Sequence, residues 1–72
     1  MNKKDKKEIV LINNLLEAAN NRILELKSRL EKKQAKIEEF FPIMTEQLRD
    51  EIIALGYANG YVKDAVETLE GI

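Results

Sequence analysis

A chain of 72 residues with a net charge of −1 at pH 7 is one domain at most, and it contains neither cysteine nor histidine. These absences exclude disulfide frameworks, thiolate nucleophiles, imidazole bases and nearly all zinc sites, and no phosphate-binding glycine loop takes their place. We therefore expect a non-enzymatic protein without catalytic residues, cofactor or metal. A domain this small buries only about 60% of the surface of its unfolded chain, so it usually gains stability from a partner.

The charge is distributed unevenly along the chain. Residues 1–42 carry ten basic and seven acidic side chains, a net charge of +3, whereas residues 43–72 carry two basic and six acidic ones, a net charge of −4. The basic half favours an acidic partner, and the acidic half resists phosphate. The apolar run from Ile9 to Ile12 is too short for a signal peptide or a membrane span. We expect a soluble, cytoplasmic protein with no membrane partner.

Residues 1–41 are predicted to form one long helix, because no Pro or Gly precedes Pro42. Counting in sevens from Ile9 gives two positions of a coiled-coil seam. The first position holds Ile9, Leu16, Ile23, Leu30 and Ile37, and the second holds Ile12, Ala19, Leu26, Lys33 and Phe40. Steps of three and four over about five heptads are typical of a coiled coil. The apolar residues of this seam, all except Lys33, are the predicted oligomer interface.

The partner of this seam is left open by the sequence, although a dimer is favoured. In a parallel homodimer Arg22 would meet Lys27 of the other chain, and an antiparallel pair, an acidic partner or the chain's own acidic half would relieve that repulsion. Further apolar residues, Val10, Leu11, Leu15 and Leu24, lie outside the seam and predict a bundle at the N-terminal end. The alternative is a monomeric three-helix bundle.

Residues 42–72 are predicted to form a short helical hairpin. Its first helix starts at Pro42, and Gly56 is expected to end it. Asn59 and Gly60 supply a cap and a turn, and Gly71 ends the second helix. Two apolar faces would meet, formed by Met44, Leu48, Ile52 and Leu55 and by Val62, Ala65, Val66 and Leu69. The predicted fold class is therefore all-α, with a long N-terminal coiled-coil helix followed by a C-terminal hairpin similar to a helix-turn-helix.

A stretch of about 16 residues carries the spacing of a known DNA-binding segment. It holds Leu55, Gly56, Gly60, Val62, Ala65, Leu69 and Glu70. This pattern resembles the helix-turn-helix of winged-helix repressors of the GntR type, in which Ser and Arg stand where this chain has Ala58 and Asn59. The resemblance implies a recognition helix that would turn Asn59, Tyr61 and Lys63 toward the major groove.

Two functions follow from these patterns. The first is a small helical oligomerisation and protein-interaction protein, an adaptor or inhibitor of the kind that phages and mobile elements encode. Its partners would be itself and another protein, which Tyr57 and its neighbours would contact. The alternative is a dimeric DNA-binding transcriptional regulator that uses Tyr57, Asn59, Tyr61 and Lys63, against which the acidic C-terminal half argues.

Overall fold

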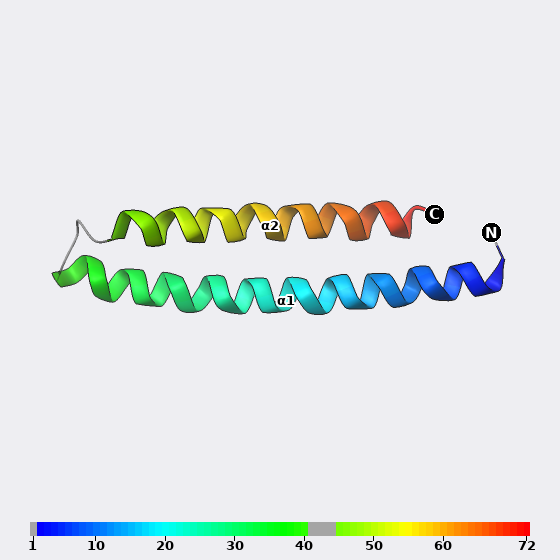
Figure 1. Cartoon of the computed structure of the whole chain (residues 1–72), viewed down its shortest axis with the longest axis horizontal. Coiled ribbons are helices and arrows are strands. Elements are labelled where there is room, and N and C mark those ends of the chain that lie inside the picture. Colours follow the sequence, from blue (N-terminus) through cyan, green and yellow to red (C-terminus); the bar gives the residue numbers. More distant parts are fainter. Residues whose placement is uncertain (1, 41–44) are drawn as a thin grey trace.

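The computed structural model describes residues 2–40 and 45–72, which form two helices packed side by side. Helix α1 spans Lys3–Phe40 with 38 residues, and helix α2 spans Glu46–Glu70 with 25 residues. They run antiparallel and place both termini at the same end of a rod (Figure 1). The rod measures 58 × 14 × 12 Å. The prediction of an all-α chain, with a long helix followed by a shorter helical segment, is confirmed.

Helix α1 forms as the sequence predicts. The side chain of Asn2 caps it, since Asn2 Oδ1 accepts a hydrogen bond of 2.8 Å from the backbone N–H of Asp5. No Pro or Gly interrupts the helix, and it passes through Asn20 without a break. The predicted stop at Pro42 and the predicted contact residue Met44 lie outside the described residues.

Helix α2 differs from the prediction, because the turn expected at Gly56–Gly60 is absent. Glu46–Glu70 is one continuous helix, neither glycine has a positive φ, and Asn59 lies inside the helix instead of capping one. An isolated Gly in a helix costs only about 1 kcal/mol. Contacts with α1 continue on both sides of these residues and outweigh that cost. The predicted end at Gly71 is confirmed, since its N–H donates to the carbonyl of Glu67 at 3.2 Å.

The helices meet along two rows of half-buried residues, each spaced by alternating steps of three and four. The row on α2 consists of Leu48, Ile52, Leu55, Asn59, Val62, Val66 and Leu69, preceded by Thr45. The row on α1 consists of Ile9, Asn13, Leu16, Asn20, Ile23, Lys27, Leu30, Gln34 and Ile37. No hydrophobic side chain among the described residues is fully buried, whereas Thr45 is only 2% exposed. The hairpin therefore has a contact line between two helices but no closed hydrophobic core.

Candidate interaction surface

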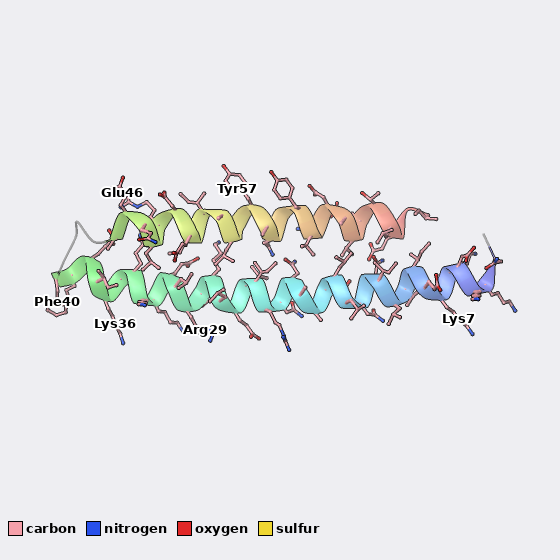
Figure 2. The ribbon with its side chains drawn as sticks, viewed as in Figure 1. Lys7, Arg29, Lys36, Phe40, Glu46 and Tyr57 are labelled. Carbon is pink, nitrogen blue, oxygen red and sulfur yellow. The ribbon has the colours of Figure 1, made fainter. Side chains whose placement is uncertain are left out.

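The predicted coiled-coil seam of α1 is divided between two surfaces of the helix. Its first position, Ile9, Leu16, Ile23, Leu30 and Ile37, packs against α2 of the same chain. Its second position stays open to solvent: Ile12 is 45% exposed, Leu26 40% and Phe40 70%, and Ala19 is exposed as well. Figure 2 shows Phe40 at the loop end of the hairpin, turned away from α2. One chain thus covers only half of the seam.

The two sides of the hairpin differ in the residues that flank the contact row of each helix. On α1, a residue four positions after a seam residue lies about 40° to one side, and a residue three positions after it lies about 60° to the other. Asn13, Asn20, Lys27 and Gln34 occupy the first side, where α2 places Arg49, Gly56 and Lys63. We call this side the polar face.

Three contacts between the helices occur on the polar face. Asn59 Nδ2 donates a hydrogen bond of 2.8 Å to Asn20 Oδ1 in a half-buried position. Arg49 and Glu38 form an ion pair at 3.6 Å, which is well exposed and contributes little stability. The stem of Lys27 passes beside Gly56, since a Cβ atom there would lie at an ordinary contact distance of 3.8 Å from Lys27 Cε. The polar face is therefore bridged by contacts within the chain, while Val10 and Leu24 at its outer edge on α1 are 58% and 44% exposed.

The opposite side of the hairpin presents small and large apolar side chains to solvent. We call it the apolar face, and it consists of Ile12, Leu15, Ala19 and Leu26 of α1 with Ala54, Ala58, Tyr61 and Ala65 of α2. Leu15 is 63% exposed and Tyr61 72%. Arg22 is the charged residue that interrupts this stretch on α1. Exposed apolar side chains gathered on one side of a small protein are typical of an interaction site.

The residues predicted to contact a partner or DNA do not share one surface of α2. Asn59 turns toward α1 and is held there by Asn20. Tyr61 belongs to the apolar face, and Lys63 to the polar face. Tyr57, which is 64% exposed, points directly away from α1 (Figure 2). A single flat partner could therefore meet Tyr57 together with one of the other three residues, but not all four.

Two hollows lie between the helices. One of about 310 Å³ at the open end is lined by Lys6, Ile9, Val10, Asn13, Leu69, Glu70 and Ile72. The other, of about 250 Å³ near the loop, is lined by Lys33, Ile37, Gln47, Leu48 and Glu51. The first lining is mostly aliphatic and suits an apolar side chain. The second brings Lys33 and Glu51 to the same side of the hairpin as the apolar face.

Neither the chemistry of the described residues nor similarity to other proteins assigns a function to this chain. The described residues contain no group of three or more Asp or Glu side chains that could hold a metal ion. Within residues 2–40 and 45–72, neither helix has a stretch long and apolar enough to cross a bilayer. No protein-family model matches the sequence, and neither the curated proteins nor the solved structures gave a significant match. The surface of the hairpin is thus the feature from which function has to be inferred.

Sequence reasoning missed the pairing of Asn20 with Asn59 and the alanines of the apolar face. A signal for both was present, since Leu48, Leu55, Val62 and Leu69 repeat at seven-residue intervals across the glycines. Extending that repeat puts Asn59 in line with Ile52 and Val66, in the row that meets α1. Ala58 and Ala65 then fall together on one side of that row.

We expect Asn20 and Asn59 to be coupled, because each amide is the hydrogen-bond partner of the other in a half-buried site. Asn59→Leu or Asn20→Leu alone should lower the free energy of unfolding by about 1 kcal/mol, since each leaves one amide without its partner. The double replacement should recover most of that loss, although it removes a polar pair that fixes the helix register. A double-mutant cycle by urea unfolding measures the coupling, with the exposed Asn21→Leu as control. Additive effects of the two replacements would contradict the pairing.

Proposed function

We propose that this chain is a non-enzymatic helical protein that associates with itself and uses the resulting bundle to bind another protein. The observation that carries the proposal is the apolar face, which a single hairpin leaves in water. An adaptor or inhibitor needs no catalytic group, and this reading agrees with a chain that lacks cysteine and histidine.

The exposed area of the hairpin supports self-association. The chain has an accessible surface of 5955 Å² at a mass of 8.3 kDa. A compact monomer of that mass exposes about 4,600 Å². The excess, on the order of 1,400 Å² per chain, is larger than the ~800 Å² that each partner buries in a standard protein–protein interface. One hairpin is therefore too open to be a self-sufficient domain.

Tyr57 is the residue that we propose for contact with a different protein. It lies on the outer side of α2, opposite the contact with α1, and would remain accessible after the apolar face is covered. Tyr is enriched at protein interfaces because its ring combines apolar area with a polar hydroxyl. The DNA-binding alternative has weaker support, since Asn59 is engaged within the hairpin and residues 43–72 carry a net charge of −4.

Sedimentation equilibrium from low to high micromolar concentration tests the proposal. We expect a mass of at least twice 8.3 kDa at high concentration, with dissociation on dilution accompanied by loss of helical circular dichroism. A helical species of 8.3 kDa at every concentration would remove the proposal. In that case, retardation of duplex DNA at low salt that is lost in Lys63→Glu would favour the alternative.

A further inference from the structure

The apolar face has the dimensions of a dimer interface. Helix α2, with 25 residues, is about 37 Å long, and two adjacent helices are about 20 Å wide. Their common face therefore covers roughly 700 Å², near the ~800 Å² per partner of a standard interface. Burial of this area accounts for about half of the excess surface of each isolated hairpin.

The side chains on this face are complementary in size between the two helices. Helix α1 contributes the larger aliphatic residues Ile12, Leu15 and Leu26, whereas α2 contributes mostly alanines. The level of each residue along the rod follows from the contacts within the chain, which join Asn20 to Asn59 and Lys27 to Gly56. These contacts place Leu26 between the levels of Ala54 and Ala58, Leu15 level with Ala65, and the small Ala19 beside the large Tyr61.

The charges beside the apolar face favour a dimer in which α1 of one copy lies against α2 of the other. Arg22, Arg29 and Lys36 recur every seven residues along the outer edge of α1, and Figure 2 shows Arg29 and Lys36 pointing away from α2. These cations would repel one another if α1 met α1 of a second copy. Helix α2 carries Glu51 beside the apolar face, at the level of Arg29 of α1. Opposite charges thus meet when α1 of one copy lies against α2 of the other.

From these features we infer that a second copy of this chain packs on the apolar face, with α1 of each copy against α2 of the other. The two-fold axis then runs parallel to the helices, both interhelical loops lie at the same end, and every neighbouring pair of helices is antiparallel. Each large residue of α1 meets a small one of α2 at the same level, because rotation about this axis keeps the level unchanged. This arrangement rests on the proposed self-association and specifies its surface and geometry.

Replacement of two exposed alanines of α1 tests whether the apolar face is the dimer interface. Ala19 and Ala35 are both exposed on α1 of the isolated hairpin, but Ala19 lies on the apolar face and Ala35 does not. Ala19→Glu buries a carboxylate twice in the symmetric interface and should raise the dimer Kd about 100-fold, whereas Ala35→Glu should leave it within about threefold. Loss of helicity in Ala19→Glu that is reversed at high protein concentration would also support the surface, since both alanines are exposed in the single hairpin.

Single cysteines in this cysteine-free chain test the geometry. One chain carries Ala19→Cys and the other Tyr61→Cys, two positions at the same level along the rod, and the two are mixed under mild oxidation. The mixed disulfide should form well above the half that random pairing gives, and neither chain should crosslink efficiently to itself. Rapid crosslinking of Ala19→Cys to itself, or random pairing, overturns the arrangement.

Failure of this inference is distinguishable from failure of the proposed function. If the unmodified chain sediments as a dimer while Ala19→Glu and Ala35→Glu have equal effects, the interface lies elsewhere and self-association stands. A monomeric unmodified chain overturns both.

Discussion

Replacing Ile23 by Asp is expected to unfold the hairpin or to lower its melting temperature by about 15 °C or more. Ile23 is the central residue of the α1 row that faces α2, and it is half-buried there. The replacement removes roughly 1–2 kcal/mol of apolar burial and sets a carboxylate against apolar side chains, which costs a further 1–3 kcal/mol or so. For a chain of this size the total stability is only about 4–11 kcal/mol, so about half of it would be lost.

Ser28→Asp provides the control for this experiment. Ser28 is exposed on the same helix, and its replacement introduces the same charge away from α2. Thermal unfolding followed by circular dichroism should show a change of less than about 3 °C for Ser28→Asp. An unchanged melting temperature in Ile23→Asp would show that α1 does not pack on α2 through this row.

The double replacement of Gly56 and Gly60 by Ala should have the opposite effect and stabilise the chain by about 2 kcal/mol. Both glycines lie inside α2 with helical backbones, where Ala is favoured by roughly 1 kcal/mol per site. There is space for both methyl groups, since a Cβ on Gly56 would lie 3.8 Å from Lys27 Cε and one on Gly60 has no atom within 4 Å. The melting temperature should rise by about 8–16 °C.

Gly71→Ala is the matched control, because Gly71 follows the last residue of α2 and its Cβ would meet the carbonyl oxygen of Thr68 at 3.4 Å. No gain in stability is expected there. A helix-turn-helix with a turn at Gly56–Gly60 predicts the reverse result at the first two sites, because alanine is poorly tolerated where a turn needs a positive φ. Destabilisation by Gly56→Ala and Gly60→Ala would therefore restore the turn and contradict a continuous α2.

Much of the fold was predictable from local sequence rules. Helix α1 follows from 36 consecutive residues, Asp5 to Phe40, without Gly or Pro, and the end of α2 follows from Gly71. The prediction of a turn at Gly56 was wrong because it considered only the conformational freedom of glycine. Whether a glycine breaks a helix depends on the packing around it, and here Leu55 and Asn59 keep contact with α1 on either side.

The candidate interface was predictable only in part, for a different physical reason. A stripe of Ile and Leu shows that a helix needs a packing partner. It does not show whether that partner belongs to the same chain or to another. Helix α2 takes the row of Ile9, Leu16 and Ile23, and it turns toward the side of Asn20 because Asn59 pairs with that residue. The side of Ile12 and Leu26 is consequently the one left open.

An isotope-filtered NOE experiment on an equal mixture of ¹³C-labelled and unlabelled chain separates contacts within one chain from contacts between two copies. One row of α1 should pack within the chain, while the apolar face packs on a second copy. We expect contacts between chains from the methyl groups of Leu15 to Ala65 and from Ala19 to the ring of Tyr61, and none from Val10 or Leu24 on the polar side. Interchain contacts confined to Val10 and Leu24, or no interchain contacts at a concentration where the chain is fully helical, would contradict this packing.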